Sequence, residues 1–166
     1  VIIHAAAISD PDSCERDSEL AVEINQKGTE HIAEAAKRTG AKLVYISTSF
    51  VFPENGTYSP SDSPDPQTEY GRTKYSGEIA VQENTEDHIT LRCPKLFGTA
   101  ELEEVTDITE SILQALTENG RIELDNTTER YPVFVDNVVT AIQRLLDIEA
   151  QGIYHLSTHE PYTKYE

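Results

Sequence analysis

Short apolar segments alternate with longer segments of helical periodicity along this chain of 166 residues, and that order restricts its fold more than any other feature. The apolar segments are typical of buried strands and occupy residues 1–7, 42–47, 88–93 and 152–156. The segments with helical spacing occupy residues 16–38, 68–84, 103–118 and 136–146. Successive parallel strands need a crossover of this length, and such crossovers are right-handed. The order therefore predicts an α/β fold, a doubly wound parallel sheet with helices on both faces.

The two parts of the chain differ in regularity. Residues 1–93 alternate strand and helix, whereas residues 94–166 form a mixed segment with a short strand predicted at 121–124 and an extended stretch at 132–135. The loop at 53–67 is long for a compact domain, and loops of this kind often carry function. Val1 already lies inside a predicted strand, and the chain ends on what resembles the opening of a helix. We therefore expect a fragment of a longer parent protein.

Composition argues against several classes of function. A net charge of −17 would repel nucleic acid and anionic membrane surfaces. No apolar run approaches the roughly 18 residues that a membrane span requires. Cys14 and Cys93 lack metal-ligand spacing, so we expect two reduced thiols in a cytoplasmic protein. The acidic balance fits either a cytosol of high ionic strength or an ordinary acidic protein, and both interpretations stay open.

Tyr70 and Lys74 are the strongest candidates for chemistry. They lie four residues apart at the start of a predicted helix, so their side chains share one face. A neighbouring ammonium favours the phenolate, and we expect Lys74 to lower the Tyr70 pKa into the range of a useful general acid/base. The hydroxyl of Thr48 follows a buried strand, at the sheet edge where such folds bind ligands. The three residues together predict carbonyl/alcohol redox chemistry.

The spacing Tyr70-x-x-x-Lys74, together with a strand that ends in Ser47-Thr48-Ser49, resembles the extended short-chain dehydrogenase/reductase family. Within that family the chain is most similar to the dTDP-4-dehydrorhamnose reductase branch, which also includes the regulatory β subunit of methionine adenosyltransferase. The matching segments follow the family's order along nearly the whole chain. They are residues 1–7, 25–29, 46–52, 70–78, 91–98, 131–137 and 152–166.

The resemblance implies a partial Rossmann-type sheet. Residues 1–93 would be the C-terminal half of an NAD(P)-binding domain. Residues 94–166 would supply the last sheet elements and part of a smaller C-terminal substrate-binding region. The Gly-rich turn that opens such domains is not in the sequence, and we expect it upstream of Val1. The cofactor would be NAD or NADP, without a stated preference.

The resemblance also assigns roles to residues. The catalytic residues it implies are Thr48, Tyr70 and Lys74. The implied cofactor-binding residues are Ala5, Ala6, Ala7, Ser47, Tyr70, Lys74 and Pro94. The implied substrate-binding residues are Thr48, Ser49, Lys95 and Arg130. Tyr70 would act as the general acid, Thr48 would polarise a carbonyl, and Lys74 would bind the nicotinamide ribose.

Some of these positions have a simpler structural explanation. Ala5–Ala7 may serve close packing between strand and helix as readily as cofactor binding. Asn25 is expected chiefly to tie a helix to a neighbouring strand. His4 and His155 lie in apolar strands and are interpreted as core histidines with a bonded ring nitrogen. No histidine shows metal-ligand spacing, so no metal site is expected.

The function implied is reduction of a keto group on a nucleotide-linked deoxysugar, and the family also allows a homodimer. Ser49 stands where the rhamnose-reductase branch usually has Asp, and Lys95 where it has Trp, so the sugar is not specified. Two alternatives stay open. One is a non-catalytic regulatory subunit that resembles the methionine adenosyltransferase β subunit. The other is an NAD-dependent nucleotide-sugar epimerase or dehydratase, although Ser49 and Phe50 supply none of the acidic groups common in dehydratases.

Overall fold

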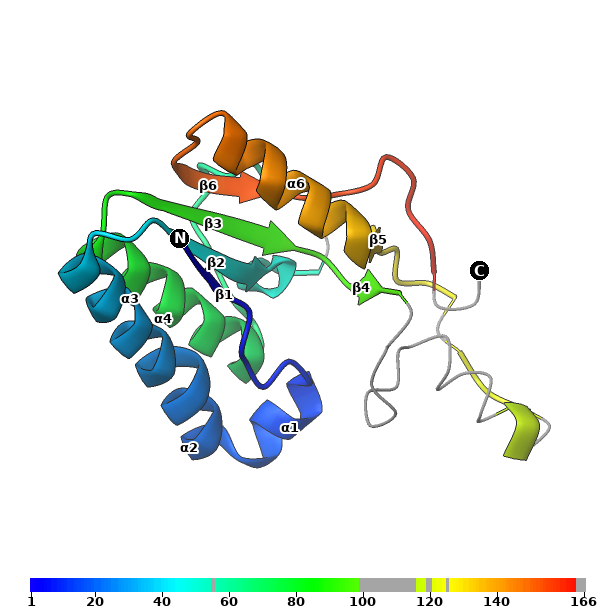
Figure 1. The fold of residues 1–166 in the computed structure, drawn as a ribbon. Coiled ribbons are helices and arrows are strands. Elements are labelled where there is room, and N and C mark those ends of the chain that lie inside the picture. The colour runs from blue at the N-terminus through cyan, green and yellow to red at the C-terminus, as the bar shows by residue number, and fades with distance from the viewer. Residues whose placement is uncertain (55, 99–115, 119–120, 125, 164–166) are drawn as a thin grey trace.

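Four parallel strands form the main sheet of the protein (Figure 1). The computed structural model describes residues 1–54, 56–98, 116–118, 121–124 and 126–163. The strand order is β1 (Ile2–His4), β2 (Leu43–Thr48), β3 (His88–Cys93) and β6 (Gly152–His155), and each neighbouring pair is parallel. The carboxyl ends of all four strands therefore lie at one edge of the sheet.

Helices cover both faces of this sheet (Figure 1). One face carries α1 (Pro11–Arg16), α2 (Ser18–Ala21), the π-helix η1 (Val22–Lys27), α3 (Gly28–Thr39) and α4 (Glu69–Asn84); the other carries α6 (Val135–Asp147). A 3₁₀ turn, η2 (Ser49–Val51), follows β2, and β4 (Leu96–Phe97) pairs in parallel with β5 (Val133–Phe134). This arrangement confirms the predicted α/β fold of the Rossmann type.

Strand β2 sends alternate side chains into two cores. Leu43 and Tyr45 pack with Ala33, Ala36 and Val81 from α3 and α4. Val44 belongs instead to a cluster on the α6 side, which is made of Val44, Ile89, Leu91, Cys93, Val133, Val138, Ile142 and Ala150. Because both faces are covered, β2 and β3 need apolar side chains at nearly every position, which is why the sequence shows continuous apolar runs there.

The helix predicted at 16–38 is confirmed, because α2, η1 and α3 follow one another without a break from Ser18 to Thr39. It begins at Ser18, where the Asp17 side chain accepts a hydrogen bond of 3.0 Å from the Leu20 amide. The short helix α1 before it was not predicted. Its N-cap is Asp10, whose side chain accepts a hydrogen bond of 2.9 Å from the Ser13 amide.

Three further expectations in the second part of the chain have different outcomes. Residues 121–124, predicted as a strand, are irregular. Asp136 is not the cap of its helix: Phe134 occupies that position, and Asp136 lies in the first turn of α6, where a carboxylate is favourable. The helix predicted at 103–118 lies mostly outside the described residues. The described helices include none long and apolar enough to cross a membrane.

The start of α4 lies very close to η2. A Cβ atom at Gly71 would overlap the backbone oxygen of Phe50, so only glycine allows this approach. The neighbouring side chains are brought together as a result: the rings of Phe50 and Tyr70 meet edge to face with centroids 5.6 Å apart. The contact places the start of α4 against the carboxyl end of β2.

This contact predicts that Gly71→Ala destabilises the parent protein. Overpacking against backbone should lower the free energy of unfolding by about 2–3 kcal/mol, measured by urea denaturation. Gly28→Ala is the matched control, because its Cβ would meet Glu23 at an ordinary 3.6 Å and alanine favours a helix. Equal stability of the two variants would contradict the close contact.

Candidate active site

Tyr70 and Lys74 lie in the first turns of α4, at the carboxyl edge of the sheet. The helix starts there because the Thr68 side chain accepts a hydrogen bond of 3.1 Å from the Gly71 amide and so caps it. Tyr70 is half-buried and Lys74 is buried. The helix thus carries a phenol and an ammonium toward the end of β2.

Thr48 ends β2 and lies beside Tyr70. Its side-chain oxygen accepts a hydrogen bond of 3.3 Å from the Phe50 amide, which caps η2. The Thr48 side chain also lies close enough to the Tyr70 phenol to lower the pKa of that phenol. The strand end and the helix start therefore bring the two hydroxyls together, as the proposed chemistry requires.

The direction expected for the Tyr70 pKa is wrong for this structure. Burial raises the pKa of Tyr70, and the neighbouring Thr48 side chain lowers it only in part. Lys74 is not among the groups that shift the pKa of Tyr70; its Nζ packs over the Tyr45 ring, 4.2 Å from the centroid. Tyr70 is consequently a protonated phenol at neutral pH, the state that a proton donor needs.

Lys74 is a buried cation with an altered proton affinity. Lys74 is only 2% exposed. Burial lowers the pKa of its ammonium to about 8, although the negative charge of Glu78 acts to raise it. Its ammonium contacts the Tyr45 ring as a cation–π pair. No side chain within the described ranges accepts a hydrogen bond from Nζ, so its donors could serve a bound hydroxyl group.

The expected cofactor residues Ala5–Ala7 directly follow β1. Ala5 and Ala6 are exposed and Ala7 is half-buried at this end of the sheet. Their part in cofactor binding stays a prediction. Ser47 differs, because its hydroxyl is buried and donates to Glu78 at 2.5 Å.

Asn25 and His4 have structural partners, as expected. The Asn25 amide accepts from the Ile8 amide at 2.8 Å and donates to the Ile8 carbonyl at 3.0 Å, which ties η1 to the segment after β1. The ring Nε2 of His4 lies 3.0 Å from the Thr29 hydroxyl, which itself donates to the Asn25 carbonyl at 2.6 Å. Since that hydroxyl has one proton, the His4 ring donates to it.

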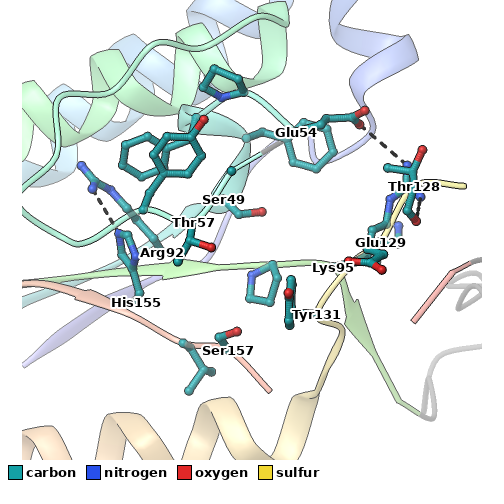
Figure 2. A pocket seen from close by; sticks show the side chains of 18 residues that line it. Ser49, Glu54, Thr57, Arg92, Lys95, Thr128, Glu129, Tyr131, His155 and Ser157 are labelled. Carbon is teal, nitrogen blue, oxygen red and sulfur yellow. Dashed lines mark hydrogen bonds and ion pairs between the residues drawn. The ribbon is translucent and has the colours of Figure 1, made fainter. Parts of the chain in front are cut away.

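A cavity of about 430 Å³ opens beside Ser49, the residue that follows Thr48 in the chain (Figure 2). It brings together Ser49, Pro94, Lys95 and Arg130, four residues that the sequence analysis assigned to substrate or cofactor. Its remaining lining comes from the loop after β2, from the segment before β5 and from the end of β6. The other predicted site residues, Ala5–Ala7, Ser47, Thr48, Tyr70 and Lys74, are not among the residues that line it.

The cavity collects basic side chains in a strongly acidic chain. Arg92, Lys95 and Arg130 line it together with two carboxylates, Glu54 and Glu129. Arg130 forms an ion pair of 3.7 Å with Glu54, which joins the two sides of the opening, as the dashed line in Figure 2 shows. A cluster of guanidinium and ammonium groups is suited to an anionic ligand such as a phosphate.

Two features of the site were not predicted. The first is the buried ion pair of Glu78 with Arg92, whose exposed fractions are 0% and 3%. The position of Glu78, one helical turn after Lys74, was the available signal. The second is a stack of Phe52 on Tyr58, with ring centroids 4.5 Å apart. It depends on the path of a loop that no periodicity specifies.

Neither cysteine takes part in a disulfide. Cys14 and Cys93 are both free and buried, and burial raises the pKa of the Cys93 thiol to about 12. Among the described residues, no group of three or more His, Cys, Asp or Glu side chains could hold a metal ion.

The fold and the residues at the sheet edge define a Rossmann-type protein of the short-chain dehydrogenase/reductase class. The family model for the RmlD substrate binding domain matches residues 1–166. The chain belongs to this family.

The named relatives include a subunit of methionine adenosyltransferase and a probable reductase. The chain is 36% identical over 172 residues to methionine adenosyltransferase 2 subunit beta of Bos taurus, covering 100% of this chain and 52% of the relative. It is 27% identical over 166 residues to the probable low-salt glycan biosynthesis reductase Agl14 of Haloferax volcanii, covering 98% and 55%. The chain thus spans about half the length of these relatives.

The fold is similar to that of solved reductases. The crystal structure of dTDP-4-dehydrorhamnose reductase from Bacillus anthracis, in complex with NADP, matches with a TM-score of 0.90 and 30% identity over 98% of this chain and 58% of that chain. A hypothetical dTDP-4-dehydrorhamnose reductase from Sulfolobus tokodaii matches with a TM-score of 0.85 and 30% identity over 99% and 57%.

The buried ammonium predicts that Lys74→Met stabilises the cofactor-free parent protein at pH 7. The folded protein binds the Lys74 proton less tightly than the unfolded chain does, so this residue costs stability below pH 8 and the cost disappears as pH rises toward 10.5. We expect the free energy of unfolding at pH 7 to rise by about 1–3 kcal/mol in the variant. Urea denaturation measures it.

The same measurement at pH 9.5 provides the control. There the advantage of Lys74→Met should shrink, because the wild-type amine is then largely neutral in the folded state. A variant less stable than the wild type at pH 7, or an advantage independent of pH, would show that Lys74 is not a desolvated cation.

Proposed function

We propose that the parent protein is an NAD(P)-dependent oxidoreductase that reduces a keto group of a nucleotide-linked deoxysugar. The observation that carries this proposal is the meeting of Thr48 with Tyr70 at the carboxyl edge of a parallel sheet, one helical turn from Lys74. Hydroxyl, phenol and ammonium are the groups that reduction of a carbonyl requires from a protein. A cavity with basic side chains opens beside them.

Each of the three residues has a separate task. Tyr70 donates the proton to the substrate oxygen, and its raised pKa keeps the phenol protonated for that step. Thr48 holds the same oxygen by a hydrogen bond and so orients the carbonyl. A bound nicotinamide cofactor supplies the hydride for the carbonyl carbon. Lys74 binds a ribose hydroxyl of that cofactor and keeps a positive charge near the reacting atoms.

The cofactor fits the open space after β1. The small side chains of Ala5 and Ala6 are exposed there, and a larger side chain would fill the same space. The Lys74 ammonium supplies donors for ribose. The similar reductase from Bacillus anthracis was solved with NADP, and this supports a nicotinamide cofactor without deciding between NAD and NADP.

The cavity beside Ser49 is proposed to hold the nucleotide-sugar. Arg130 and Lys95 are the groups for the diphosphate, because an anion is the natural partner of clustered cations. Glu54 is a competing internal anion that pairs with Arg130 in the absence of ligand. The position of Ser49, directly after Thr48, supports a sugar that lies near the Thr48 hydroxyl.

A second candidate function is a non-catalytic regulatory subunit. It is favoured by one observation: the identity to methionine adenosyltransferase 2 subunit beta, 36%, exceeds the 30% found with the solved reductases. The presence of Thr48, Tyr70 and Lys74 in one site favours the enzyme. Stoichiometric co-purification with a methionine adenosyltransferase, together with no reductase activity, would reverse the ranking.

Tyr70→Phe in the parent protein tests the chemistry. Loss of the phenolic proton should lower turnover of dTDP-4-dehydrorhamnose by about 10²- to 10⁴-fold, while the affinity for NADPH stays close to that of the wild type. Steady-state kinetics and a fluorescence titration of the cofactor measure the two effects.

Tyr75→Phe, on the same helix, is the matched control and should retain activity. Unchanged turnover in Tyr70→Phe would remove Tyr70 from the reaction.

A further inference from the structure

A row of polar side chains crosses the main sheet beneath α4. Ser47 of β2 and His155 of β6 are both register partners of Arg92 on the strand between them, β3. Partners in a parallel sheet point to the same face. Glu78 reaches this row from α4. Three strands and the catalytic helix therefore meet at one set of polar atoms.

One side of the Arg92 guanidinium is used to hold α4. Its Nη2 donates to Glu78 Oε2 at 2.7 Å and its Nε to Oε1 at 3.0 Å. Ser47 donates to the same Oε1. Burying such a pair is costly unless its bonds are well made, and two donors on one carboxylate meet that condition. These bonds hold α4 in position against β2 at Ser47, the residue before Thr48.

The other side of Arg92 faces the cavity. Nη1 lies 3.3 Å from His155 Nε2, as the dashed line in Figure 2 shows, and donates to the Pro60 carbonyl at 3.4 Å. Arginine has no acceptor, so the histidine accepts at Nε2 and carries its proton on Nδ1. That side of the ring forms a hydrogen bond with the Tyr58 backbone. Arg92 and His155 thus each hold one backbone carbonyl of the same loop.

The loop carries the aromatic wall of the cavity. The Phe52 ring lies between the Arg92 guanidinium, 5.0 Å from its centroid, and the Tyr58 ring, which stacks on it at 4.5 Å. His155 contacts the edge of Phe52 with centroids 5.7 Å apart. The wall therefore depends on the same two side chains that hold the loop backbone.

We propose that Arg92 is a positioning residue that couples the catalytic helix to the wall of the substrate cavity, with His155 as the second anchor of that wall. This proposal rests on the proposed function, and it assigns a different role to each side of the Arg92 guanidinium. The Glu78 side of Arg92 positions Tyr70 and Lys74 through α4. The His155 side shapes the cavity through the loop at 52–60.

This division predicts different kinetic effects for the two anchors. His155→Leu removes a loop anchor and leaves the ion pair intact, so in the parent protein the KM for dTDP-4-dehydrorhamnose should rise about tenfold, the equivalent of one hydrogen bond, with kcat little changed. Arg92→Lys keeps a positive charge beside Glu78 but loses the planar guanidinium, which bonds both Glu78 and the Pro60 carbonyl. This variant should therefore lower kcat and raise KM. His155→Gln, which can still accept and donate, should restore much of the wild-type KM.

Hydrogen exchange of the loop amides provides a readout that needs no activity. Exchange at residues 56–62 should become about tenfold faster in His155→Leu and in Arg92→Lys, since each loses a bond to this segment. His88→Leu is the matched control. His88 also lies on β3, at its other end, where its ring bonds the Thr85 carbonyl at 2.8 Å. The control should leave exchange at 56–62 and the KM unchanged.

The outcomes separate this proposal from the proposed function. Unchanged loop exchange in both anchor variants would overturn the proposal, as would a KM unaffected by His155→Leu in an active enzyme. If the wild-type parent protein does not reduce the sugar, the proposed function fails. The anchoring role is then tested without any activity, by hydrogen exchange of the loop amides and by the affinity of the variants for dTDP, measured by calorimetry.

Discussion

The structure depends on two ionisable side chains that α4 carries into the interior, Lys74 and Glu78. A charge removed from water must find a partner or change its protonation state. Glu78 finds Arg92 and Ser47, and the ion pair fixes the helix on the sheet. Lys74 has an aromatic face and a pKa lowered to about 8. The buried Lys74 ammonium thus lowers the stability of the protein at the position where the chemistry is proposed. Such strongly perturbed groups are common at functional sites.

The remainder of the site follows from this placement. Parallel strands bring their carboxyl ends to one edge, and the close contact at Gly71 holds the start of α4 against the end of β2. Thr48 and Tyr70 meet there, while the cavity beside Ser49 is lined by Arg92, Lys95 and Arg130. The same fold could serve a regulatory subunit without using the hydroxyls, so the chemistry of the site, rather than the fold, separates the two candidate functions.

Periodicity was sufficient to predict the strands of the main sheet and the helices at 18–39 and 69–84, because a strand covered on both faces must be apolar throughout. It missed the short helix α1, which the Asp10 cap starts, and it predicted a strand at 121–124, where the described chain is irregular. Spacing placed Tyr70 and Lys74 on one face. It could not give their protonation, because the desolvation that raises one pKa and lowers the other depends on packing from distant segments. The loop that carries Phe52 and Tyr58 has no repeating pattern at all.

The most direct test of the account is a crystal structure of the parent protein with NADP and a dTDP-linked sugar bound. The account predicts that the reacting sugar oxygen lies within hydrogen-bonding distance of both Thr48 and Tyr70, that Lys74 contacts the nicotinamide ribose, and that the diphosphate displaces Glu54 from Arg130. A sugar bound away from the Thr48 and Tyr70 hydroxyls, or a cofactor that does not reach Lys74, would contradict it.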